Sequence, residues 1–309
     1  MTMTRSRFLR ATAAAMAGAA ASSFSAAHDV LPAPRLRTRP IPSSGAALPV
    51  IGCGTWMTFD VGSSPAERAP LAATLRSFFD AGGSLIDSSP MYGQSEQVVG
   101  DLLIAAKSRE RAFVATKVWT RGREAGIAQM QNSMQKLGTD RIDLMQVHNL
   151  VDWREHLPTL REWKAAGRIR YIGITHYTRG AYAEVEAVMR AEKLDFVQIN
   201  YAIDDRAAEE RILPLAADRG IAVLINRPFS AGALFRKVRD TPLPAWASEL
   251  ECTSWAQLFL KFVLSHPAVT CAVPGMSSAA HVADNIAAGT GTLPDARQRL
   301  RIAGLWDAR

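Results

Sequence analysis

Four side chains that can take part in proton transfer stand at or just after the ends of apolar runs: Asp87, Tyr92, Lys117 and His148. A phenol has an ordinary pKa of about 10 and is a poor proton donor at neutral pH. A nearby ammonium lowers the pKa of a phenol, and a carboxylate offsets the cost of burying that ammonium. An imidazole can donate a hydrogen bond that orients a substrate oxygen. The set predicts proton delivery to a carbonyl oxygen, with hydride supplied by another group.

Each of the four residues also has a structural explanation. Asp87 is an ordinary turn residue, Tyr92 can be a surface phenol, and Lys117 can extend into solvent from a strand end. His148 can be a hydrogen-bonded core histidine. Any one of them alone favours the structural explanation, whereas four at neighbouring strand ends favour a shared site.

From Leu48 onward, short apolar runs alternate with amphipathic stretches. The runs are rich in Val, Ile, Leu and aromatic residues, as strands covered on both faces are. These strands are expected at 49–56, 84–89, 112–119, 142–148, 169–176, 195–201, 221–229 and 269–275. Helices are expected at 66–83, 94–107, 124–137, 154–168, 180–193, 205–219, 253–265 and 278–288. Gly82, Gly167 and Gly220 stand where helix C-terminal caps are expected.

Eight βα units over roughly 240 residues predict an α/β fold, a single-domain (β/α)8 TIM barrel with a parallel sheet. A doubly wound sheet is the alternative. Its dinucleotide-binding fingerprint requires a third glycine after the first strand, which GCGTW at residues 52–56 lacks. The barrel is therefore favoured. Active sites of barrels lie at the C-terminal ends of the strands, where Asp87, Lys117 and His148 stand.

The formal net charge of +7 is concentrated near the N-terminus, and the rest of the chain is close to charge balance. Composition therefore does not indicate a nucleic-acid partner. The three cysteines, Cys53, Cys252 and Cys271, are too few and too scattered for a disulfide framework or a zinc site. The six histidines lack the short paired spacing of a metal motif, so no metal is expected.

Residues 1–27 are expected to be a signal peptide, 28–46 a linker and 47–309 the barrel domain. Residues 4–10 read TRSRFLR, a basic segment followed by a weakly apolar one that is too short to span a membrane. The segment resembles a twin-arginine export signal, although Ser6 separates Arg5 from Arg7. We expect export machinery as a partner, a periplasmic or exported location and no stable membrane insertion. The alternatives are a disordered tail and a cytoplasmic protein.

The chain from about Leu48 to Ala288 resembles the aldo-keto reductases. The motifs that carry the resemblance are GCGTW at 52–56, GGSLIDSSPMYGQSE at 82–96, TKVW at 116–119 and DLMQVH at 143–148. The resemblance implies that Tyr92 is the general acid/base, that Lys117 and Asp87 tune it, and that His148 positions the carbonyl. Hydride would come from NADPH, with NADH as the alternative, and the product would be an alcohol.

The resemblance also implies a set of cofactor-binding residues. They are Gly54, Thr55, Trp56, Thr175, His176, Gln198, Asn226, Arg227, Ser277, Ser278, His281, Asp284 and Asn285. Three positions depart from the family pattern. Thr175-His176 replaces Ser-Asn, Asn226 replaces a tyrosine that stacks on the nicotinamide, and His281 stands where a basic residue is usual. Arg227 suits a pyrophosphate or, alternatively, a surface salt bridge.

Trp56 and Trp119 match positions that line the substrate pocket of the family, so we expect a small aldehyde or ketone as substrate. Either tryptophan alternatively caps the core. Two other functions remain open from the sequence. One is a non-catalytic nicotinamide-nucleotide sensor on the same barrel, and the other is an exported binding protein that uses the barrel as a scaffold.

Overall fold

The computed structural model describes residues 35–309, in which eight strands form one parallel sheet. Its strands are β3 (Cys53–Gly54), β4 (Leu85–Asp87), β5 (Phe113–Val118), β6 (Ile142–His148), β7 (Ile169–Thr175), β8 (Phe196–Asn200), β9 (Ala222–Asn226) and β10 (Cys271–Ala272). Each strand pairs with the next in sequence. Parallel bridges from Ile51 to Ala272 and from Gly54 to Gly275 join the first strand to the last. The predicted (β/α)8 barrel is confirmed.

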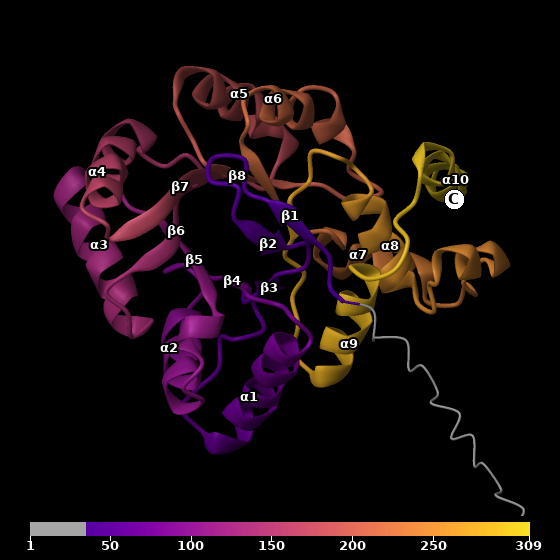
Figure 1. Cartoon of the computed structure of the whole chain (residues 1–309), viewed down its shortest axis with the longest axis horizontal. Helices are drawn as coiled ribbons and strands as arrows, with labels where there is room; N and C mark the ends of the chain where they lie inside the picture. The colour runs from indigo at the N-terminus through magenta and orange to yellow at the C-terminus, as the bar shows by residue number, and fades with distance from the viewer. Residues whose placement is uncertain (1–34) are drawn as a thin grey trace, which may run out of the picture. The chain divides into compact units, whose positions relative to one another are not determined.

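Helices surround the sheet (Figure 1). Those that follow successive strands are α1 (Pro65–Asp80), α2 (Ser95–Ala105), α3 (Arg123–Lys136), α4 (Trp153–Ala165), α5 (Tyr182–Ala191), α6 (Ile212–Asp218), α8 (Trp255–Leu264) and α9 (Ala279–Ala288). Two further helices, α7 (Ala233–Val238) and α10 (Ala296–Asp307), were not expected from the sequence. Gly82, Gly167 and Gly220 have the positive φ that a helix C-terminal cap requires.

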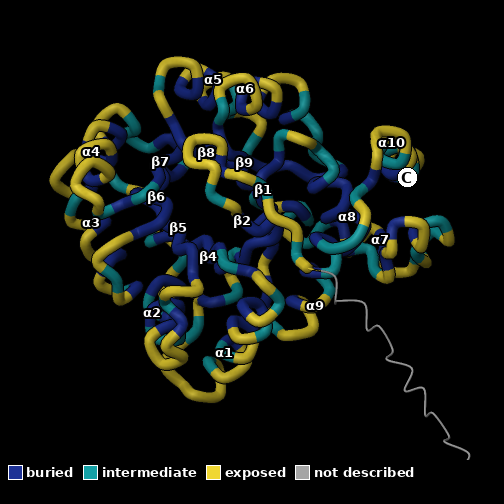
Figure 2. Tube along the Cα trace, in the orientation of Figure 1, coloured by how far each residue is buried: buried dark blue, intermediate teal, exposed yellow. Residues whose placement is uncertain are grey.

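The strands are mostly buried, whereas the surrounding helices carry exposed segments (Figure 2). The buried apolar side chains form two clusters. One face of each strand packs against the helices. The other face fills the barrel, where Leu85, Phe113, Leu144, Tyr171 and Phe196 share a cluster near the strand starts. Because side chains alternate with a period of two, the next inward positions lie one layer higher. The inward side chains thus change from apolar at the strand starts to polar at the strand ends.

The extended linker predicted for residues 28–46 is wrong over residues 38–46. Strand β1 (Thr38–Pro40) pairs antiparallel with β2 (Ala47–Pro49), and the pair forms a hairpin. Ile41 and Leu48 from this hairpin are buried in the same cluster as the lower layer of the barrel. Arg39 fixes the hairpin by donating to backbone carbonyls that include Leu264 O at 2.6 Å and His266 O at 3.1 Å. The hairpin closes the end of the barrel opposite the strand C-termini.

The predicted signal peptide at residues 1–27 and the first part of the predicted linker lie outside the described residues. Among residues 35–309, no helix is long and apolar enough to cross a membrane.

Candidate active site

The structure brings the four proton-transfer candidates together at the C-terminal ends of neighbouring strands. Asp87 ends β4, Lys117 lies one residue before the end of β5, and His148 ends β6. Tyr92 follows on the loop after β4. The Lys117 Nζ atom is 4.9 Å from the centre of the Tyr92 ring, and the Tyr92 and His148 ring centres are 5.9 Å apart, edge to face.

Lys117 and Asp87 form a buried ion pair. Nζ donates to Asp87 Oδ1 at 3.0 Å, to Oδ2 at 2.9 Å and to the backbone oxygen of Ser88 at 2.6 Å. Asp87 Oδ1 also accepts from Gln198 Nε2 at 2.9 Å and Gln146 Nε2 at 3.3 Å. Burial opposes the charge of Lys117, but Asp87 leads the interactions that raise its pKa above the ordinary value. Lys117 is therefore an ammonium ion, whose desolvation these bonds offset.

The pKa of Tyr92 departs from the sequence expectation. Burial raises it above its ordinary value, and this outweighs the lowering that Lys117 causes. The sequence led us to expect that the Lys117 ammonium lowers the pKa of Tyr92 below its ordinary value. In the protein without cofactor or substrate, that expectation is wrong. Tyr92 is a neutral phenol with Lys117 beside it, so it holds a proton that it can donate. The ammonium then favours the phenolate that remains after donation.

His148 is a neutral imidazole. Burial lowers its pKa to about 2, with further lowering by the charges of Lys117 and His176. Its Nδ1 atom lies 3.0 Å from the hydroxyl oxygen of Ser89. A neutral ring beside an ammonium adds no second positive charge, and it keeps one N–H for hydrogen bonding.

The lowered pKa of His148 predicts a loss of stability in acid. An unfolded histidine takes up a proton below about pH 6.5, and the buried ring does not, so the free energy of unfolding should fall as pH drops below that value. The contribution of one such group is at most about 1.4 kcal/mol per pH unit. His176 and His266 also have lowered pKa values and contribute in the same direction.

Denaturant unfolding of the wild type and of His148→Gln at pH 7.5, 6.0 and 5.0 would measure this contribution. The variant should lose less stability between the first and last pH than the wild type does. Equal losses in both proteins would contradict the assignment of a neutral, buried imidazole.

A cavity of about 600 Å³ opens above these residues. Eight residues that the sequence assigned to cofactor or substrate line it: Gly54, Thr55, Trp56, Trp119, Thr175, Gln198, Asn226 and Arg227. Sequence reasoning missed several others in the wall, including Met57, Met91, Asn149, Tyr177 and Phe235. Apart from Asn149, these are large apolar or aromatic side chains that are exposed. Exposed apolar side chains that gather in one place indicate a binding site, but the sequence does not show which side chains are exposed.

One wall of the cavity is a network of amides. Thr175 Oγ1 donates to Gln198 Oε1 at 3.3 Å, and Asn226 Nδ2 donates to the same atom at 3.4 Å. Asn226 Nδ2 also donates to the backbone oxygen of His176 at 3.0 Å. His176 itself does not line the cavity; its Nδ1 accepts the backbone N–H of Tyr177 at 3.0 Å. His176 thus holds the start of the loop after β7, and its predicted contact with a cofactor stays a prediction.

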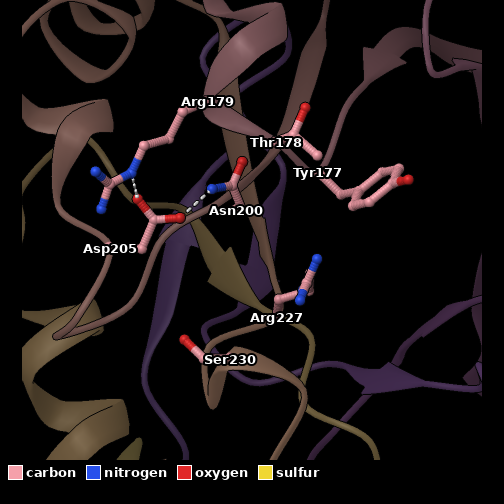
Figure 3. Close-up of a pocket in the computed structure, with 7 residues that line it drawn as sticks. All are labelled: Tyr177, Thr178, Arg179, Asn200, Asp205, Arg227 and Ser230. Carbon is pink, nitrogen blue, oxygen red and sulfur yellow. Dashed lines mark hydrogen bonds and ion pairs between the residues drawn. The ribbon is translucent and has the colours of Figure 1, made fainter. Parts of the chain in front are cut away.

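A second pocket of about 270 Å³ adjoins the cavity (Figure 3). Tyr177 and Arg227 line both spaces. Arg179 pairs with Asp205 at 2.5 Å, whereas Arg227 has no carboxylate partner within 4.0 Å among residues 35–309. Arg227 also has a φ of +51°, a strained conformation for a residue with a side chain. The surface salt bridge weighed for Arg227 is not formed among these residues; its guanidinium lies 5.7 Å from the centre of the Tyr177 ring, and no carboxylate there would compete with an anion for it.

The segment expected to hold the adenosine phosphate lies outside both spaces. Ser278 caps α9 by accepting the backbone N–H of His281 at 3.2 Å, and Ser277 Oγ lies 3.2 Å from His281 Nδ1. Asp284 Oδ1 accepts from Ser254 Oγ at 2.7 Å, which joins α9 to the start of α8. Asn285, next to it, is buried. Asp284 thus has a structural contact that the sequence did not predict.

In the described part of the chain, no group of three or more His, Cys, Asp or Glu side chains is arranged to hold a metal ion. Cys53, Cys252 and Cys271 are buried free thiols, and burial raises the pKa of each of them.

Comparison with known proteins agrees with this geometry. The model of the aldo/keto reductase family matches residues 50–299. The methylglyoxal reductase YeaE of Escherichia coli is 29% identical over 252 residues, which cover 79% of this chain and 87% of that protein. An NADH-specific methylglyoxal reductase of the same organism is 29% identical over 245 residues, covering 67% of this chain and 72% of the relative.

A solved structure resembles the whole barrel. The aldo-keto reductase of Klebsiella pneumoniae in complex with NADPH superposes with a TM-score of 0.74 at 25% identity, covering 88% of this chain and 95% of that one. The family match spans most of the chain and includes all four residues of the proton-transfer site. The chain belongs to the aldo/keto reductase family.

Proposed function

We propose that this protein reduces small aldehydes and ketones to alcohols with NADPH as the hydride donor. The observation that carries the proposal is the neutral phenol of Tyr92 at the base of a large cavity, between the Lys117–Asp87 ion pair and the neutral imidazole of His148. These groups provide a proton, a charge that favours the phenolate and a hydrogen-bond donor, which are the needs of a carbonyl oxygen that gains negative charge.

The residues of the cavity fit a nicotinamide nucleotide. Asn226 has a buried amide oxygen without a hydrogen-bond partner among residues 35–309, and Arg227 has an unpaired guanidinium in the wall shared with the adjoining pocket. Amides suit a carboxamide, and a guanidinium suits a pyrophosphate. Asn226 and Gln198 would hold the nicotinamide end, and Arg227 the pyrophosphate. When bound, the cofactor supplies hydride to the carbonyl carbon.

The protein's own residues perform the remaining work. His148 orients the carbonyl oxygen toward Tyr92, and Tyr92 transfers its proton to that oxygen. Lys117 then stabilises the phenolate, because the ammonium lies against the Tyr92 ring. Trp56 and Trp119, both exposed in the cavity wall, cover the substrate and limit the access of water.

Coenzyme choice is part of the proposal. A solved relative binds NADPH and a curated relative is named as NADH-specific, so both coenzymes occur among similar proteins. Steady-state oxidation of NADPH and of NADH should be measured with methylglyoxal and with an aromatic aldehyde. We expect turnover with a preference for NADPH. A folded protein that binds nucleotide and turns over neither aldehyde would instead support a nucleotide sensor.

We also propose that residues 1–27 export the protein, already folded and loaded with cofactor. The support is the sequence TRSRFLR followed by a weakly apolar segment and a small-residue cleavage site. Fractionation of cells that express the full chain would test this proposal. A shortened protein in the exported fraction is expected, whereas a full-length protein found only in the cytosol would contradict it.

A further inference from the structure

Ser89 is a buried hydroxyl next to His148 to which the sequence assigned no role. It lies two residues after the end of β4 and has 0% exposure. Its Oγ lies 3.0 Å from His148 Nδ1 and accepts the backbone N–H of Met91 at 3.4 Å. The imidazole is otherwise bounded by the rings of Tyr92 and Trp119, whose centres lie 5.9 and 6.3 Å away.

The hydrogen bonds of Ser89 determine which nitrogen of His148 carries the proton. A hydroxyl has one hydrogen to donate, and among residues 35–309 only His148 Nδ1 is placed to accept it. If Nδ1 carried the ring proton, it would donate to Oγ, and the hydroxyl hydrogen would be buried without a partner. Buried polar groups avoid that state. The hydroxyl therefore donates to Nδ1, and the ring proton is on Nε2.

The other side of the ring faces the cavity. His148 lines the cavity. Its Nε2 atom has no hydrogen-bond partner among the described residues, and it is not fully buried. Nε2–H is therefore accessible to a substrate. The Nδ1–H tautomer would instead present a lone pair to the cavity at Nε2. A ring rotated by half a turn would present a carbon atom there.

We propose that Ser89 is a positioning residue that fixes His148 in the Nε2–H tautomer, so that the imidazole can only act as a hydrogen-bond donor to the substrate oxygen. The function of this donor rests on the proposed carbonyl reduction. The tautomer itself follows from the contacts of the protein alone, and it is supported by the burial that keeps the ring neutral.

The tautomer can be measured directly. Protein with 15N-labelled histidine would be studied by two-dimensional 1H–15N NMR, with the His148 signals identified by their absence in His148→Gln. Ser89→Ala removes the donor to Nδ1. Ser88→Ala is a matched control, because Ser88 is an equally buried serine whose Oγ contacts Thr55 Oγ1 at 3.0 Å and not His148.

We expect the wild type and Ser88→Ala to show His148 with the proton on Nε2, and Ser89→Ala to show a mixture of tautomers. We also expect Ser89→Ala to lower kcat for an aldehyde by about tenfold to a hundredfold through lost orientation, with an unchanged Kd for NADPH. A wild-type His148 with the proton on Nδ1 would overturn the proposal. So would a Ser89→Ala variant with an unchanged tautomer and unchanged kcat.

The NMR measurement tests the tautomer of His148, and the turnover measurement tests the proposed carbonyl reduction. The NMR measurement needs neither cofactor nor substrate, so it decides the tautomer even if no aldehyde is turned over. Absence of turnover in the wild type would contradict carbonyl reduction and leave the tautomer result to stand on its own.

Discussion

Replacement of Tyr92 by phenylalanine is expected to lower kcat for aldehyde reduction by about a hundredfold to ten-thousandfold. The substitution removes the only phenol among residues 35–309 that lies against Lys117 and His148, and with it the proton for the substrate oxygen. The Kd for NADPH should change little, because the ring remains in place. Initial rates with NADPH and an aldehyde, together with nucleotide binding measured by fluorescence, would check this expectation.

Tyr182→Phe is the matched control for removal of a phenolic hydroxyl. The Tyr182 hydroxyl donates to the backbone oxygen of Asn200 at 2.8 Å, and the residue does not line the catalytic cavity. This control should retain the wild-type kcat. If Tyr92→Phe retained kcat to within about threefold as well, another group would have to be the proton donor, and the account of the site would be wrong.

Separation of the Lys117–Asp87 ion pair is expected to have the largest effect on stability. Lys117→Met leaves a carboxylate with 3% exposure and no charged partner, and loss of one member of a buried pair typically costs about 3–5 kcal/mol. Asp87→Asn leaves the ammonium uncompensated and should cost a similar amount. Both variants should also lose most of their activity. Lys117→Met removes the charge that stabilises the Tyr92 phenolate, and Asp87→Asn removes the partner that holds this charge in position.

The double variant Lys117→Met/Asp87→Asn distinguishes the two effects. It contains no uncompensated buried charge, so denaturant unfolding should show part of the lost stability restored, while kcat stays low. The account of a coupled pair would fail if the two single variants each cost less than about 1 kcal/mol, or if their costs simply added in the double variant.

The sequence was sufficient for the parts of this site that follow from local pattern. Asp87, Lys117 and His148 each end an apolar run, and parallel strands with a period of two bring their ends to one edge of the barrel. The four proton-transfer residues could therefore be found together. The barrel itself followed from the count of βα units, since every strand pairs with its neighbour in sequence.

What the sequence could not predict depends on contacts between distant segments. The direction of the Tyr92 pKa shift is set by the surrounding burial, which no local pattern reports. The hairpin of β1 and β2 is rich in Pro, Arg and Ser, a composition typical of a linker. Only the structure shows that its Ile41 and Leu48 pack against the lower apolar layer of the barrel. Asp284 was predicted as a cofactor-binding residue from the resemblance alone. Its contact with Ser254, the N-cap of α8, could be found only in the folded structure.

Ser89 illustrates the remaining gap. Ser89 lies in the same motif as Asp87 and Tyr92. Serine is so common in turns, however, that its presence there gave no reason to assign it a function. Its importance follows from a single distance to His148, across 59 residues of sequence. A buried serine beside a functional histidine is a signal that only the structure could supply.

The central claim is that hydride from a nicotinamide cofactor and a proton from Tyr92 reach the same carbonyl group in this cavity. The most direct test is the reduction of an aldehyde with NADPH that carries deuterium in both positions at C4 of the nicotinamide. The account predicts an alcohol with one deuterium on the former carbonyl carbon, formed by the wild type and nearly lost in Tyr92→Phe. An alcohol without deuterium at that carbon, or no alcohol from a folded protein saturated with NADPH, would contradict it.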